Sequence, residues 1–133
     1  MTPQRIQLSR QKGFNLQEAS IALNGVAAVK VDRTTRWGNP FTPDECRAMG
    51  FTGEDDEIAE RCVAAFTVWL GPNWQHQWPG RASYLMRMRL LESMAELRGK
   101  NLACWCKTGV LGSPCHADVL LKLANKQPLT EKQ

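Results

Sequence analysis

The sequence lacks any long apolar run, and its first dozen residues hold no hydrophobic stretch. A helix that crosses a membrane needs about 20 apolar residues in succession. A secretory signal needs an apolar segment after a basic start. We therefore expect neither membrane association nor export, and we expect the protein to be cytoplasmic.

Basic residues are not concentrated anywhere in the chain. The 17 lysines and arginines give a formal net charge of +4, but they are scattered and form no dense tract. A mildly basic surface permits a partner that carries phosphate, such as a nucleotide or a nucleic acid, without requiring one. The pattern does not favour a dedicated DNA-binding face.

The cysteines are too few and too unevenly placed to form a framework of disulfides. The chain has five of them, an odd number, and three lie within residues 104–115. Small secreted domains that depend on disulfides spread paired cysteines along the chain. We therefore expect reduced thiols, which agrees with a cytoplasmic protein.

The apolar content is sufficient for one hydrophobic core. Apolar residues make up 43% of the chain and charged residues 23%, values close to those of globular proteins. A length of 133 residues is typical of one domain and short for two. We predict a single domain over residues 1–133, with flexible tails at 1–4 and 126–133.

Three short stretches have the composition and pattern of strands, residues 5–8, 27–31 and 102–106. Helical patterns stand between them, although residues 16–23 fit either a short helix or an approach to the Asn24-Gly25 turn. We predict a small α/β fold in which helices flank a mostly parallel sheet in Rossmann-like layers. In such folds ligands bind at the carboxyl ends of the strands.

Two of the predicted helices have clear signals. A capping box at residues 42–45 starts a short helix, in which Cys46 occupies a hydrophobic staple position. A longer helix over 54–70 places five apolar side chains on one face: Ile58, Cys62, Ala65, Phe66 and Trp69. These patterns assign Cys46 and Cys62 to the core and exclude them from a functional site.

Two more helices are predicted in the second half. One covers residues 84–98 and has an apolar stripe of Tyr84, Met88, Leu91 and Ala95. The other begins after Ser113, which would cap it, with Pro114 at its first position. The free backbone N–H groups of Cys115 and His116 would then stabilise an anion or a thiolate.

Three thiols and an imidazole gather where the last strand ends and the last helix begins. One hypothesis is a zinc site of Cys104, Cys106, Cys115 and His116, because thiolates and imidazole are ordinary zinc ligands. A second makes Cys106 or Cys115 a catalytic nucleophile or redox thiol, with His116 as its base and Asp118 orienting the imidazole. A third treats all of them as buried structural residues, with Asp118 only complementing the helix dipole.

The loop after the second predicted strand is the other candidate segment. Arg36 is suited to hold a phosphate or carboxylate, Trp37 to stack on a ring, and Asn39 to offer an amide. Gly38 permits a tight turn or the close approach of a ligand. The alternative is a plain turn that leads into the capped helix, with Arg36 solvated.

Four segments together resemble a known family: RIQL at 5–8, TRWGNPF at 35–41, LRGKNLACWC at 97–106 and PCHADVL at 114–120. The family is the domain of unknown function 4326, which we associate with phage and bacterial genomes. The resemblance spans nearly the whole chain. It implies that both candidate segments belong to a shared pattern, and it implies no established activity.

These patterns support one leading hypothesis. We expect a small cytoplasmic enzyme or ligand-binding domain that acts on a nucleotide, a nucleobase or a modified nucleic acid. In it Arg36 holds an anionic group, Trp37 and Asn39 contact a ring, and the Cys–His group does chemistry or binds zinc. The rivals are a zinc-stabilised module that binds nucleic acid or protein without catalysis, and a thiol redox sensor.

Overall fold

A three-stranded parallel sheet lies at the centre of the fold. The structure is a computed structural model that describes residues 2–76, 82–106 and 115–125. Its strands are β1 (Arg5–Gln7), β2 (Ala28–Lys30) and β3 (Asn101–Cys104), in the order β1-β3-β2. Ile6 is paired with Ala103, and Val29 with Leu102. The predicted parallel sheet is confirmed, and each strand is shorter than the sequence pattern indicated.

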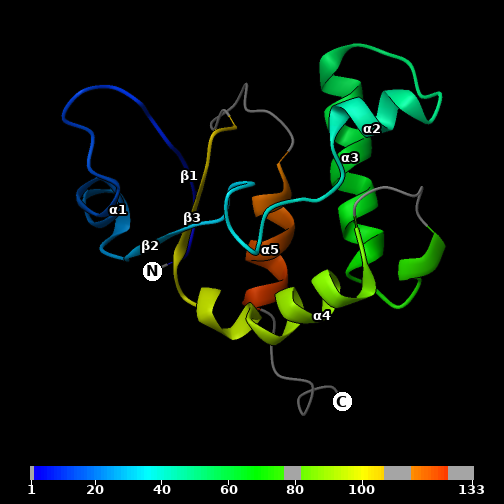
Figure 1. Cartoon of the computed structure of the whole chain (residues 1–133). Helices are drawn as coiled ribbons and strands as arrows, with labels where there is room; N and C mark the ends of the chain where they lie inside the picture. The colour runs from blue at the N-terminus through cyan, green and yellow to red at the C-terminus, as the bar shows by residue number, and fades with distance from the viewer. Residues whose placement is uncertain (1, 77–81, 107–114, 126–133) are drawn as a thin grey trace.

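Helices cover both faces of this sheet (Figure 1). α1 (Leu16–Asn24) lies on one side and α5 (His116–Ala124) on the other. Side chains alternate along β3 accordingly, because Leu102 belongs to the core cluster shared with α5, whereas Ala103 packs with Ile6 on the α1 side. The predicted α/β class with helices on both sheet faces is therefore confirmed.

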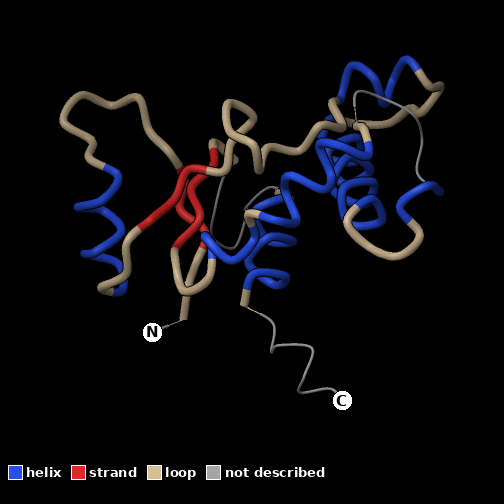
Figure 2. The backbone as a smooth tube through the Cα atoms, turned by 60° about the horizontal axis from the view of Figure 1, so that its bottom comes forward, coloured by secondary structure: helices blue, strands red, loops and turns tan. Residues whose placement is uncertain are grey.

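The remaining helices extend the fold on the α5 side, while α1 stands apart on its own side of the strands (Figure 2). They are α2 (Pro43–Ala48), α3 (Asp55–Trp69) and α4 (Tyr84–Glu92), with short 3-10 turns η1 (Trp74–His76) and η2 (Met94–Leu97). α3 packs against α5. In the described part of the chain, no helix has the length and apolar content needed to cross a membrane.

The first half of the chain follows its sequence signals closely. Residues 16–24 form a helix, and Gly25 ends it in the left-handed region with φ of 78°. Thr42 caps α2 by accepting a hydrogen bond from the Glu45 N–H. All five residues predicted on the inner face of α3 are buried. Burial raises the pKa of the Cys62 thiol to about 11, as expected of a core cysteine.

The predicted helix over residues 84–98 is wrong in its second half. α4 ends at Glu92, and the chain continues through Ser93 into the 3-10 turn η2. A 3-10 turn has three residues per turn instead of 3.6, so the buried positions shift along the chain. Leu90 and Leu97 are buried, whereas Tyr84 and Ala95 of the predicted stripe are exposed.

A buried polar network fastens the start of β3 to its neighbours. The Asn101 side chain is fully buried, and its Nδ2 donates to Ser20 Oγ (2.7 Å) and Asn24 Oδ1 (2.8 Å). Its Oδ1 accepts from the Gln4 N–H (2.8 Å) and from Asn24 Nδ2 (3.0 Å). One side chain of β3 thereby contacts α1 and the residue that precedes β1.

Replacing Asn101 should destabilise the whole domain. Asn101→Ala leaves several buried donors and acceptors without partners, so we expect the free energy of unfolding to fall by about 2 to 4 kcal/mol. Urea unfolding followed by tryptophan fluorescence measures it. The control Gln11→Ala, in an exposed loop, should change stability by less than about 0.5 kcal/mol. Equal stability of the two variants would contradict the role of Asn101.

Candidate metal centre and the adjacent loop

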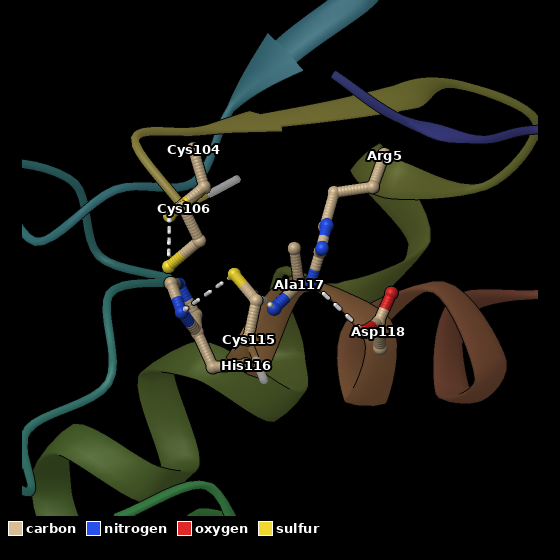
Figure 3. A network of polar contacts seen from close by, with 7 residues as sticks. All are labelled: Arg5, Cys104, Cys106, Cys115, His116, Ala117 and Asp118. Atoms are coloured by element: carbon tan, nitrogen blue, oxygen red, sulfur yellow. Dashed lines mark hydrogen bonds and ion pairs between the residues drawn. The ribbon is translucent and has the colours of Figure 1, made fainter. Parts of the chain in front are cut away.

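The thiols of Cys104, Cys106 and Cys115 meet between β3 and α5 (Figure 3). All three Sγ atoms lie within 4.8 Å of one another. The Sγ atoms of Cys104 and Cys106 are 3.8 Å apart. β3 ends at Cys104 and not at Cys106 as predicted, because the chain bends after residue 104. The three sulfur atoms are close enough to bind one metal ion.

Cys115 also caps α5. Its Sγ accepts a hydrogen bond from the Ala117 N–H (3.4 Å), and the helix proper begins at His116. The prediction that Ser113 caps the helix is therefore wrong, and Ser113 and Pro114 themselves lie outside the described residues. The Cys115 sulfur sits at the positive end of the helix dipole, where negative charge on sulfur is stabilised.

His116 points away from the sulfur cluster with its Nε2. That atom lies 2.6 Å from the Val31 carbonyl oxygen, which only accepts hydrogen bonds, so Nε2 carries the proton and donates it. Nδ1 lies 3.7 Å from the Cys115 Sγ. Burial lowers the pKa of His116 and favours the neutral ring. Within the described chain, the group of potential metal ligands consists of the three cysteines without His116.

The three thiols titrate as a set. Hydrogen bonds from Cys106 and Cys115 lower the pKa of the Cys104 thiol well below its usual value. Contact with Cys104 raises the pKa of Cys106, and it also raises that of Cys115, as does burial. The first proton is therefore lost from the cluster as a set, and the remaining thiols stabilise the negative charge that it leaves.

A positive side chain stands beside the cluster. Arg5 Nη1 forms an ion pair with Asp118 Oδ2 at 3.0 Å (Figure 3). The Arg5 charge also acts to lower the pKa of Cys106, although the contact with Cys104 outweighs it. Asp118 is thus directed to Arg5, whereas the sequence hypothesis had it orient His116.

The loop after β2 is tied to this cluster by two contacts. The Val31 carbonyl receives the hydrogen bond from His116, and the next residue, Asp32, accepts one from Trp105 Nε1 at 3.0 Å. Because β2 and β3 are parallel neighbours, their carboxyl ends lie at one edge of the sheet. The two candidate segments therefore meet at that edge.

The predicted binding residues in this loop have different environments. The Trp37 side chain is only 8% exposed and belongs to the core, and its Nε1 has no hydrogen-bond partner in the described part of the chain. Asn39 is buried; its amide donates to the Cys62 carbonyl (3.0 Å) and accepts from the Phe41 N–H (2.9 Å). These contacts stabilise the loop. Because both side chains are buried, neither offers an exposed surface on which a ligand ring could stack.

Arg36 is exposed and lines a cavity of about 290 Å³. The sequence hypothesis placed four residues of this loop at a binding site: Arg36, Trp37, Gly38 and Asn39. All of them except Trp37 border this cavity. The hypothesis missed Arg33 and Arg89, which also line it. Arg33 is three residues from Arg36 in the same loop, but Arg89 comes from α4, and no local pattern links it to the loop.

The family model for the domain of unknown function DUF4326 matches residues 6–126. The chain belongs to the DUF4326 family. The match confirms the resemblance found in the sequence, and it covers both segments of the candidate site. No curated protein and no solved structure matches this DUF4326 chain.

A side chain at Gly38 should disrupt the loop. A Cβ there would lie 2.5 Å from the Arg33 Cα and 2.7 Å from the Asp32 carbonyl oxygen, and both are backbone atoms that cannot swing aside. We expect Gly38→Ala to lower the unfolding free energy by about 1 to 3 kcal/mol.

The matched control is Gly71→Ala, where the nearest atom would be 3.6 Å away, an ordinary contact. Thermal unfolding of both variants measures the difference. Equal melting temperatures would show that the loop relaxes around the added methyl group.

Proposed function

We propose that this DUF4326 domain binds one zinc ion through Cys104, Cys106 and Cys115. The observation that carries the proposal is the spacing of the sulfur atoms. Zn–S bonds of about 2.3 Å in a tetrahedron place adjacent sulfurs about 3.8 Å apart. The Cys104 and Cys106 Sγ atoms have a separation of 3.8 Å, and the third sulfur lies within 4.8 Å of both.

The surroundings also favour deprotonated ligands. Thiolates are the form that binds zinc, and the hydrogen bonds among the three thiols, which lower the pKa of Cys104, favour the loss of a first proton from the cluster. Three thiolates and Zn²⁺ together carry one negative charge. The Arg5 guanidinium and the N-terminus of α5 supply positive charge beside it.

Three protein ligands leave one position of a tetrahedral ion for water or a substrate. Residues 107–114, which connect Cys106 to Cys115, contain no Cys, His, Asp or Glu. In the described chain, His116 does not belong to the group whose ligand atoms lie within 4.8 Å of one another, although its Nδ1 is 3.7 Å from the Cys115 Sγ. Zinc sites with three protein ligands are typical of catalysis, where the ion acts as a Lewis acid or lowers the pKa of a bound water. Cys106, the least buried of the three ligands, marks the accessible side.

The substrate part of the proposal is a nucleotide, a nucleobase or a component of nucleic acid. It is supported by Arg36, which lines a cavity at the same edge of the sheet as the cysteines. In this version the domain is a small enzyme: the loop holds the anionic group and the zinc site does the chemistry. Trp37 and Asn39 position the loop.

A second candidate is a structural zinc ion in a binding module without catalysis. It is favoured by the placement of the ligands, since Cys104 ends the central strand and Cys115 caps the helix packed on it. An ion there would fasten α5 to β3 and contribute its binding free energy to folding.

Protein purified without added metal should contain one zinc ion per chain by native mass spectrometry. Cys106→Ala should lose it, because two thiolates bind zinc far more weakly than three. The control Cys62→Ala removes a cysteine outside the cluster and should keep the ion. Metal-free wild-type protein would contradict the proposal, and a Cys104–Cys106 disulfide in it would favour the thiol redox sensor.

Cobalt replacement should separate the catalytic from the structural site. Co²⁺ bound by thiolates has visible d–d bands whose position depends on the fourth ligand. We expect added imidazole or cyanide to shift these bands, because an exchangeable ligand completes the coordination. Unchanged bands at saturating imidazole would contradict the open position and favour the structural ion.

A further inference from the structure

The cavity beside Arg36 is lined by three arginines from two parts of the chain. Arg33 and Arg36 come from the loop after β2, and Arg89 comes from α4. No acidic side chain is among the described residues that line it. Guanidinium groups of like charge repel one another, so gathering three of them around one hollow favours the binding of an anion.

Arg36 is held in position before any ligand arrives. Its Nη1 donates to Ser93 Oγ (2.9 Å) and lies 3.7 Å from Glu96 Oε2, and its guanidinium is 5.3 Å from the centre of the Trp37 ring. These contacts occupy only part of the five N–H donors of an arginine. The remaining donors are available to a ligand at little cost in side-chain entropy.

The other two arginines also bring positive charge, and they differ in how firmly their side chains are held. Arg33 donates from Nη1 to the Asn39 carbonyl oxygen, which fixes it against the loop. Arg89 has no ion pair with any side chain in the described parts of the chain. It lines both this cavity and an adjoining hollow of about 440 Å³, which Glu92 also lines.

We propose that this cavity binds the terminal phosphate of a small phosphomonoester, such as a nucleoside 5′-monophosphate. The proposal deepens the proposed function by naming the class of substrate. Arginine forms paired hydrogen bonds to phosphate oxygens, and a phosphomonoester carries nearly two negative charges near neutral pH. A phosphodiester of a nucleic-acid backbone carries one, and three arginines match it less well.

The walls also fit a small ligand. A volume of about 290 Å³ lies at the lower end of the range for small-molecule pockets, enough for a phosphate and part of the group that bears it. Thr35 and Thr42 line the cavity with hydroxyl groups that already donate to the Asp32 carbonyl and to Glu45, so the arginines supply the free donors. Met86 and Pro40 give an apolar side. This combination suits a ligand in which a charged phosphate is attached to a less polar organic group.

Isothermal titration calorimetry of the full-length, zinc-loaded protein tests the proposal. The titrants are adenosine 5′-monophosphate, adenosine, inorganic phosphate, and one oligonucleotide with and without a 5′-phosphate. We expect the monophosphate and inorganic phosphate to bind and adenosine to bind at least about tenfold more weakly, since it lacks the charged group. Equal binding of both oligonucleotides, at or above the affinity of the monophosphate, would overturn the proposal in favour of the nucleic-acid backbone.

Substitutions locate the binding. Arg89→Gln should weaken phosphate binding by about tenfold or more, the usual loss for a hydrogen bond to a charged group. Arg36→Lys keeps the charge but loses the paired geometry, and it should weaken binding too. The control Arg61→Gln removes the same charge from α3, where Arg61 covers the Phe51 ring, and should leave the affinity unchanged. An equal loss of phosphate affinity in Arg89→Gln and Arg61→Gln would mean that only the net charge of the protein matters, and it would overturn the proposed site.

The zinc content of each variant keeps this test separate from that of the metal centre. Arg89→Gln should retain the metal content of the wild type, because Arg89 is not among the potential ligands. Binding of phosphate by a metal-free protein would leave this site standing while the zinc proposal fails. Absence of binding of any phosphomonoester at millimolar concentration, in protein that holds zinc, would overturn the phosphate site alone.

Discussion

The hydrogen bond from His116 Nε2 to the Val31 carbonyl oxygen holds the candidate site together. It fixes the first turn of α5 against the end of β2, and β3 lies between β2 and β1. Cys115 precedes His116 and is thereby brought beside Cys104 at the end of β3. The loop that carries Arg33 and Arg36 starts directly after Val31. Both halves of the site thus depend on one buried contact between a helix start and a strand end.

The two halves have opposite electrostatic character. Thiolates at the cysteine cluster would concentrate negative charge, whereas the cavity of the adjacent loop gathers arginines. The hydrogen bond from Trp105 to Asp32 links the segments that bear them. A ligand with an anionic group and an electrophilic or metal-binding group would match such a pair of neighbours. Under the proposed function, recognition of the ligand and the chemistry would lie on two separate segments at one edge of the sheet.

The sequence predicted that the cysteine segment and the loop after β2 lie close together, because parallel strands bring their carboxyl ends to a common edge, and the structure agrees. It also assigned Cys62 to the core through its helical spacing, and the structure agrees. It misplaced the cap of α5, since thiols are absent from the usual cap preferences and the Cys115 role arises from the cluster itself. The sequence could not predict that Arg89 lines the cavity of the loop, because α4 meets the loop only through tertiary packing.

The position of β3 in the sheet has a consequence for how the protein is made. The central strand is the last of the three to be synthesised, and the Gln4–Asn101 hydrogen bond spans 97 positions. In the described sheet β1 and β2 each pair with β3 and not with each other, so neither can form these pairs during translation until β3 has left the ribosome. The sheet, its buried network and the cysteine cluster therefore assemble late and together, so a truncated chain that ends before residue 101 would expose two unpaired strands to aggregation.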